Sequence, residues 1–146
     1  MVLERQLRTW EPTSSRITLD GYSLESNPYD ITYGIDRQLY VADGGGNTLY
    51  RVNPRTEQLS LVTVFAGLPS TVPNPGRGGK KEADPVPTGA IAAPDGTIYV
   101  ALFSGFPFAP GTSKVVRVTP SGKVSDNWVS LILSVPACFG AEEVHL

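Results

Sequence analysis

The sequence NPYDITYGIDRQLYVA at residues 27–42 returns 59 positions later as VPTGAIAAPDGTIYVA at residues 86–101. The alignment matches Pro28 with Pro87, and it matches the closing tetrapeptide LYVA with IYVA. A self-match at a fixed spacing is the sequence signature of repeat architectures, in which one supersecondary unit occurs more than once. The repeat therefore sets the organisation of the chain.

The match continues beyond these two stretches. Residues 49–54, LYRVNP, align with residues 115–120, VVRVTP, at a longer offset of 66 positions. The second copy therefore holds seven extra residues between the matched segments, inside the stretch LFSGFPFAPGTS at residues 102–113. This insertion is the main difference between the two copies.

Each copy predicts four short strands, because β-branched and aromatic residues alternate with turn residues such as Asp95-Gly96. In the first copy we expect strands at 30–34, 38–42, 48–53 and 59–65. In the second copy we expect strands at 89–93, 97–101, 114–119 and 124–130.

A repeated unit of four antiparallel strands is typical of a β-propeller blade, so the predicted fold class is all-β, a propeller fragment of two blades. A β-sandwich built from two duplicated sheets is the alternative. The expected divisions are a partial preceding blade or flexible segment at 1–26, a first blade at 27–67, a Pro/Gly-rich surface loop at 68–85, a second blade at 86–126 and a divergent tail at 127–146.

The first copy, with its Asn-Pro start, LYVAD and an aromatic-Arg-Val ending, resembles an NHL repeat. The second copy adds the stretch SGFPFAPG at Ser104–Gly111, and with it resembles the NHL-like propellers of the ScyD/ScyE family, named for cyanobacterial scytonemin biosynthesis clusters. The resemblance covers residues 27–124 and implies a propeller of about six blades with no catalytic residues to transfer. After Asp126 no further Pro-Asp-Gly blade follows, which predicts a truncated or frame-shifted product, with a natural short variant as the alternative.

Composition agrees with many short elements joined by turns. The chain has 146 residues with 15 Gly and 13 Pro, 40% hydrophobic and 18% charged residues, which disfavours both disorder and long helices. A net charge of −2 gives no positive field for nucleic acid or an anionic membrane. Without a signal peptide or a long apolar segment, the chain as given is expected to be cytoplasmic, or extracytoplasmic if its natural N-terminus lies outside the sequence.

The sequence contains few of the residues that bind metals or form disulfides. Cys138 is the one cysteine and His145 the one histidine, which excludes an intramolecular disulfide and a Cys/His zinc site. We therefore expect no metal, no cofactor and no catalytic residue.

The insertion in the second copy holds the leading candidates for ligand binding, Phe103, Phe106 and Phe108. Three aromatic rings spaced by Pro and Gly form a rigid loop able to stack against a planar ligand. The alternative is that the rings cover the hydrophobic edge of their own blade.

Two polar residues near the end of the second strand, Asp43 and Asn47, are further ligand-binding candidates. A carboxylate at such a strand end can bind a metal or a ligand, but capping of the Gly-rich turn at 44–46 is the favoured interpretation. The second copy has Leu102 in place of Asp43, so the carboxylate is not repeated.

The stretch GRGGKK at residues 76–81 fails the phosphate-loop pattern, because Asn74 replaces the first glycine and Lys81 the Ser or Thr. What remains is a basic loop in which Arg77, Lys80 and Lys81 are candidate anion ligands. A solvated loop without a ligand is the alternative.

The repeat also contains matched tyrosines and arginines, which we interpret as framework residues whose arginines pair with turn aspartates. These residues are Tyr40 with Tyr99, Arg51 with Arg117, and the aspartates Asp36 with Asp95.

The predicted function is a non-enzymatic binding or scaffold module, associated by resemblance with scytonemin-type secondary metabolism. The alternatives are a fragment of a propeller enzyme of the gluconolactonase or strictosidine-synthase type, or a truncated product without independent function. The ligand, a protein or a small molecule, is not specified by the sequence. Two blades leave two apolar faces open, so self-association through these faces is expected.

Overall fold

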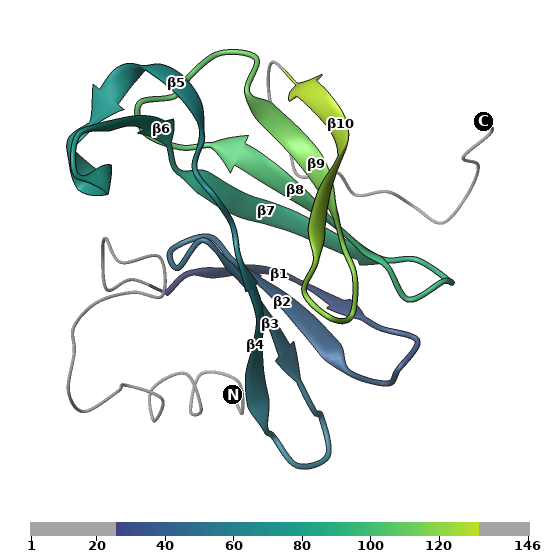
Figure 1. The fold of residues 1–146 in the computed structure, drawn as a ribbon. Coiled ribbons are helices and arrows are strands. Elements are labelled where there is room, and N and C mark those ends of the chain that lie inside the picture. The colour runs from purple at the N-terminus through teal and green to yellow at the C-terminus, as the bar shows by residue number, and fades with distance from the viewer. Residues whose placement is uncertain (1–25, 132–146) are drawn as a thin grey trace.

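The computed structural model describes the backbone of residues 26–131 and the side chains of residues 26–126. This part of the chain is all-β, as predicted, with two four-stranded antiparallel sheets and one two-stranded hairpin (Figure 1). No helix in this part is long and apolar enough to cross a membrane. The expectation for 1–26 falls, apart from Ser26, on residues outside the described part.

Each repeat forms one meander, and all eight predicted strands are present with bounds shifted by a few residues. The first sheet consists of β1 (Pro28–Tyr33), β2 (Leu39–Asp43), β3 (Thr48–Val52) and β4 (Leu59–Val64), in that order. The second sheet consists of β7 (Pro85–Ala92), β8 (Ile98–Ser104), β9 (Ser113–Val118) and β10 (Val124–Leu131), also in chain order. β10 continues into the segment expected to be a divergent tail.

The segment 68–85 is a β-hairpin and not the surface loop that the sequence predicted. β5 (Leu68–Asn74) and β6 (Lys80–Ala83) pair antiparallel, joined by a 3₁₀ turn at Pro75–Arg77. Prolines conceal the strand pattern in the sequence, but Leu68 and Ala83 are fully buried and hold both strands on the core. A mostly exposed hairpin with two buried ends shows too little alternation to be read from sequence.

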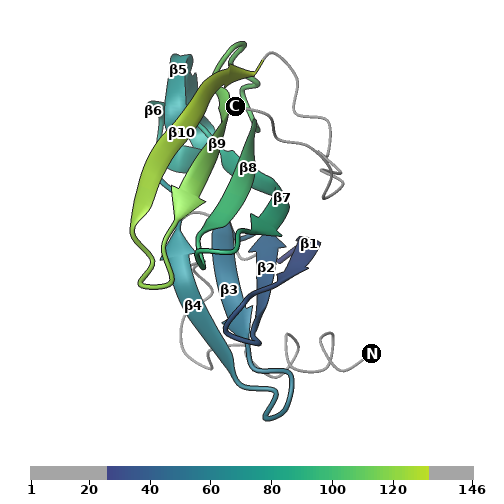
Figure 2. The same cartoon turned by 90° about the vertical axis from the view of Figure 1, so that its right-hand side faces the viewer.

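The main core lies between the two sheets. Ten buried side chains form it: Tyr40, Leu49, Phe65, Leu68, Ala83, Ile98, Val100, Leu102, Val116 and Val118. The first sheet contributes Tyr40 and Leu49, whereas five residues come from β8 and β9. The sheets lie one above the other and approach most closely at β1 and β7, as both views show (Figures 1 and 2).

Opposite faces of the two repeats meet in this core. Val100 and Val116 of the second sheet pack toward the first sheet. Their counterparts in the first repeat, Val41 and Tyr50, belong to a separate cluster with Val52. Because successive side chains on a strand point to opposite faces, this cluster lies on the side of the first sheet that carries neither Tyr40 nor Leu49.

The two matched tyrosines also lie on opposite faces of their sheets, but here the residue of the first repeat is the one in the core. Tyr40 is 1% exposed in the core, whereas Tyr99 lies between the buried core residues Ile98 and Val100 on the other face of β8. The two repeats therefore stack in the same orientation, head to tail, rather than through equivalent faces.

Hydrogen bonds fix this stacking where the edge strands β1 and β7 of the two sheets meet. Asp30 Oδ2 accepts from the Ala90 N–H at 2.8 Å, and Thr32 Oγ1 accepts from the Ala92 N–H at 3.2 Å. Because β7 is an edge strand, these N–H groups point away from its own sheet and would otherwise lack a strand partner. Two side chains of β1 therefore satisfy the edge of the second sheet.

Removing core volume from the first sheet tests this packing. Leu49→Ala is expected to lower the free energy of unfolding by about 2–5 kcal/mol, because Leu49 is fully buried between the sheets. Leu61→Ala in the same sheet, where the side chain is 44% exposed, should change it by about 0.5 kcal/mol or less. Urea unfolding measures both, and equal losses would contradict the described core.

Candidate functional site

The three phenylalanines of the insertion form one aromatic cluster. The Phe108 ring lies 6.3 Å from the Phe103 ring and 6.2 Å from the Phe106 ring, the latter pair nearly perpendicular at 78°. Phe103 is half-buried on β8, whereas Phe106 is 47% and Phe108 62% exposed. The interpretation as a cover for the blade edge therefore fits Phe103, while Phe106 and Phe108 present their rings to solvent.

Backbone contacts hold this loop in place. The Phe106 carbonyl oxygen accepts from Asn74 Nδ2 at 2.9 Å and from the Asp84 N–H at 3.1 Å. The Phe108 N–H donates to the Gly105 carbonyl oxygen at 2.6 Å. Because Asn74 and Asp84 come from the β5–β6 hairpin and its exit, the hairpin that the sequence did not predict is the support of the aromatic loop.

Arg77 is part of that support and not a ligand for a solvent anion, which corrects the sequence prediction. Its side chain is 6% exposed, with Nε 3.1 Å from Glu82 Oε2 and Nη1 3.4 Å from Asp84 Oδ1. A buried guanidinium flanked by two carboxylates is already neutralised. Lys80 and Lys81 are exposed on β6, so both lie on a strand rather than in a mobile loop.

Asp43 caps the Gly-rich turn, the interpretation that the sequence favoured. The carboxylate is 2% exposed and accepts four hydrogen bonds. The donors are Ser26 Oγ at 2.7 Å, Asn27 N at 2.7 Å, Gly45 N at 3.0 Å and Gly46 N at 3.0 Å. Both oxygens are thus used by the protein itself, which argues against a role in ligand binding.

Asn47 also serves the same turn. It is 5% exposed and adopts a φ of 54°, a left-handed conformation that asparagine tolerates better than most residues. Its carbonyl oxygen accepts from the Phe65 N–H at 2.9 Å. Within residues 26–131, no group of three or more His, Cys, Asp or Glu side chains is placed to hold a metal ion.

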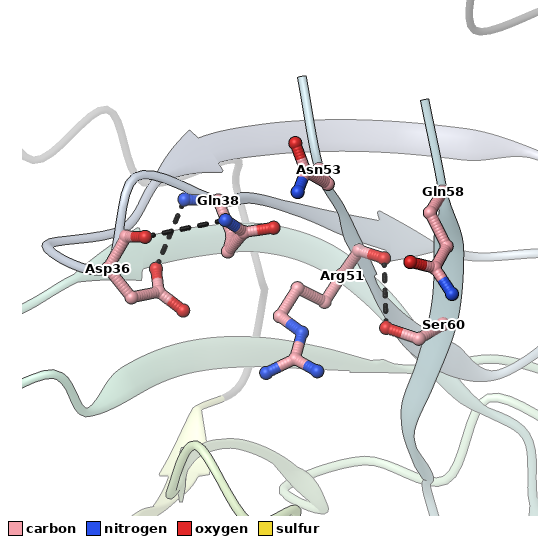
Figure 3. Close-up of a pocket in the computed structure, with 6 residues that line it drawn as sticks. All are labelled: Asp36, Gln38, Arg51, Asn53, Gln58 and Ser60. Atoms are coloured by element: carbon pink, nitrogen blue, oxygen red, sulfur yellow. Dashed lines mark hydrogen bonds between the residues drawn. The ribbon is translucent and has the colours of Figure 1, made fainter. Parts of the chain in front are cut away.

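A polar pocket that the sequence analysis did not identify lies on the first sheet (Figure 3). It has a volume of about 410 Å³ and is lined by Asp36, Gln38, Arg51, Asn53, Gln58 and Ser60. Several of these groups already bond locally: Gln38 N donates to Asp36 Oδ1 at 3.2 Å, and Ser60 Oγ donates to the Arg51 carbonyl oxygen at 3.3 Å. The repeated pairing of an aspartate with an arginine was the one sequence signal for this pocket.

The framework residues behave differently in the two repeats. In the first, the Tyr40 hydroxyl donates to Asp36 Oδ2 at 2.9 Å. Burial, and then the Asp36 carboxylate, raise the pKa of Tyr40, whereas Arg51 acts in the opposite direction.

In the second repeat, Arg117 lies 4.0 Å from Asp95 and stacks over the Tyr99 ring at 5.9 Å from its centroid. Hydrogen bonds from Thr97, and to a smaller extent Arg117, lower the pKa of Asp95. The predicted pairing of arginine and aspartate is thus confirmed for Asp95 with Arg117.

Comparison with protein-family models, with curated proteins and with solved structures found no match to this chain. The candidate site therefore rests on its own geometry. Cys138 and His145 lie outside the described residues.

Removal of the Asp43 carboxylate tests its structural role. Asp43→Ala leaves two glycine N–H groups and one asparagine N–H without their acceptor, and should lower the free energy of unfolding by at least about 1–3 kcal/mol. Asp126→Ala is the control, because the Asp126 side chain is 59% exposed and its carboxylate forms a surface ion pair with Lys114. Unchanged stability of Asp43→Ala in chemical unfolding would favour a ligand-binding role.

The raised pKa of Tyr40 predicts a loss of stability at alkaline pH. The unfolded chain releases the phenol proton near the ordinary value of 10.0, before the folded chain does, so the free energy of unfolding falls as pH rises above that value. Below pH 10.0 the contribution is complete.

Tyr40→Phe should therefore make the fall of stability above pH 10.0 shallower. Part of the slope remains, because burial also raises the pKa of Tyr50. Urea unfolding at neutral pH and at several alkaline pH values measures the slope. Identical slopes for the wild type and Tyr40→Phe would contradict the assignment.

Proposed function

We propose that this chain is a two-blade segment of an NHL-like β-propeller that serves as a non-catalytic binding module. The observation that carries the proposal is the pair of exposed rings, Phe106 and Phe108, on a loop whose backbone is anchored to the β5–β6 hairpin. A rigid exposed aromatic pair offers contact area at little cost in conformational entropy when it binds.

The propeller part of the proposal is supported by how the sheets stack. Each repeat is a four-stranded meander, and the first strands of the two meanders, β1 and β7, lie side by side. Successive propeller blades meet through opposite faces, because each is rotated from the last about a common axis. A sandwich of two sheets related by a twofold axis would join equivalent faces, and the separation of Val41 from its counterpart Val100 disfavours that arrangement.

The chemistry around the rings indicates the class of ligand. Lys80 stands opposite Asn74 in the hairpin, and Asn74 contacts the Phe106 carbonyl oxygen. Two exposed aromatic rings, on a loop anchored to a hairpin whose strand β6 carries the exposed lysines Lys80 and Lys81, favour a ligand with a flat apolar part and a negative charge. By resemblance to the ScyD/ScyE family, a role near scytonemin-type secondary metabolism belongs to this proposal.

The rival function is a propeller enzyme of the gluconolactonase or strictosidine-synthase type. Such an enzyme needs carboxylate and amide side chains that converge on a cation or substrate. Asp43 and Asn47 come from a single turn, and Asp43 accepts four hydrogen bonds within the chain. A calcium titration combined with a lactone hydrolysis assay separates the two functions, since saturable binding with turnover would favour the enzyme.

The aromatic pair is tested with anilinonaphthalene sulfonate, a dye that is flat, apolar and anionic. The double variant Phe106→Ala, Phe108→Ala should bind the dye about tenfold more weakly, corresponding to one lost aromatic contact. Its free energy of unfolding should stay within about 0.5 kcal/mol of the wild type, because both side chains are exposed.

Two further variants interpret the dye titration. Tyr33→Ala removes another exposed ring, 58% accessible on β1, and should keep the affinity of the wild type. Lys81→Ala tests whether the exposed positive charge on β6 contributes to the affinity for the dye. Full dye affinity in the double phenylalanine variant would overturn the proposed site, and loss of folding would return these residues to the core.

A further inference from the structure

The polar pocket of the first sheet lies on the sheet face that carries Tyr40 and Leu49. Arg51 follows Leu49 by two residues on β3, and it stands directly opposite Tyr40 on β2 and Ser60 on β4. Residues two apart on a strand point to the same face, as do residues directly opposite each other on paired strands. Because β3 lies between β2 and β4, Arg51 occupies the middle of the pocket.

Three amide side chains gather around this arginine at the end of the sheet. Gln38 immediately precedes β2, Asn53 immediately follows β3, and Gln58 immediately precedes β4. The Asn53 N–H donates to the Gln58 carbonyl oxygen at 2.9 Å, which holds the ends of β3 and β4 together. Figure 3 shows the Arg51 side chain between Gln38 on one side and Gln58 on the other.

The charge of Arg51 is not neutralised in the way that its counterpart is. In the second repeat, Arg117 lies 4.0 Å from the Asp95 carboxylate. Within residues 26–126, no carboxylate forms an ion pair with Arg51. The Asp36 carboxylate accepts instead from the Tyr40 hydroxyl at 2.9 Å. A guanidinium has five N–H donors, so the contact of Arg51 with the same hydroxyl leaves several for a ligand.

The three amides are not part of the framework that the two repeats share. Both repeats keep the aspartate, the tyrosine and the arginine, but the positions that match the amides hold Thr97, Thr119 and Lys123. A four-stranded meander therefore forms without amides at these positions. Their presence around Arg51 indicates a role other than folding.

The amides have hydrogen-bonding groups to spare. In the part of the chain that the structure describes, the side chain of Gln58 is exposed and has no hydrogen-bond partner. Asn53 Oδ1 accepts from the Arg55 N–H at 2.9 Å and the Thr56 N–H at 3.3 Å, which leaves Nδ2 as a donor. The pocket thus offers donors and acceptors beside one positive charge.

We infer that this pocket binds a small hydroxycarboxylate, with its carboxylate on Arg51 and its hydroxyl groups on the amides and Asp36. The planar guanidinium matches a carboxylate through two parallel hydrogen bonds. The Asp36 carboxylate in the same pocket repels a second negative charge and accepts from hydroxyl groups, which favours a ligand with one carboxylate. A volume of about 410 Å³ accommodates a molecule of this size.

Nuclear magnetic resonance titration of the full chain tests the inference with three small molecules at constant ionic strength. L-Threonate carries one carboxylate and several hydroxyl groups. L-Threitol replaces that carboxylate with a neutral hydroxymethyl group, and acetate keeps a carboxylate but lacks hydroxyls. Threonate should shift the Arg51 Nε–H and Gln58 amide resonances saturably. Threitol and acetate should each bind about tenfold more weakly or less.

Variants of the two repeats provide the matched control. Arg51→Gln should weaken threonate binding about tenfold or more, because it removes the charged partner of the carboxylate. Arg117→Gln, at the matching position of the second repeat, should keep the affinity of the wild type. Gln58→Glu adds a negative charge at an exposed position of nearly the same shape and should weaken binding several-fold. Circular dichroism checks folding, and Gln58→Glu carries the test if Arg51→Gln does not fold.

Absence of saturable shifts with threonate would overturn the inference. Equal affinity for threitol would contradict the role of Arg51, and equal affinity for acetate would contradict the role of the amides. An equal loss of affinity in Arg51→Gln and Arg117→Gln would also count against the pocket. The variant Phe106→Ala, Phe108→Ala should bind threonate like the wild type, because neither ring lines the pocket. Failure of the dye-binding proposal and failure of this inference are therefore distinguishable.

Discussion

The structure depends on one contact, the burial of Tyr40 and Leu49 of the first sheet against Val100 and Val116 of the second. A four-stranded meander has an apolar face that it cannot bury alone, and neither repeat provides a helix to cover it. Each repeat is therefore stable because the other is present. The hairpin β5–β6, the aromatic loop and the capped turn at Asp43 all attach to the frame that this contact creates.

Much of this frame could be predicted from the sequence, because the two aligned copies support the same prediction of strands and turns. The strand around Tyr40 occurs in both copies, and so do the turns at Asp36 and Asp95, whereas the Gly-rich turn at 44–46 is replaced by the insertion in the second copy. The β5–β6 hairpin occurs once, and its prolines remove the alternation that marks a strand. The hairpin therefore has neither a second copy in the chain nor an alternating pattern from which its strands could be predicted.

The candidate site could be predicted to a smaller extent, because the exposure and the ion pairs of each side chain depend on residues elsewhere in the chain. The aromatic loop was identified from its place outside the repeat, and the exposure of Phe106 and Phe108 supports that interpretation. The prediction of Arg77 as an anion ligand does not anticipate its ion pairs with Glu82 and Asp84, because the basic residues next to it in sequence do not indicate these partners. For Asp43, glycines next to an aspartate predicted the cap correctly, as short-range bonds to backbone N–H groups require no long-range information.

The replacement of Asp30 and Thr32 by Gly89 and Ile91 has a consequence for how the chain folds. Duplicated units are at risk of kinetic traps, because a strand of one unit can pair in the place of its homologue. Asp30 and Thr32 on β1 accept hydrogen bonds from the Ala90 and Ala92 N–H groups, whereas Gly89 and Ile91 at the matching positions of β7 have no side-chain acceptor. A topology in which the two repeats exchange places would therefore leave these N–H groups without those acceptors. The two positions at which the repeats differ therefore favour the observed order of stacking over the exchanged one.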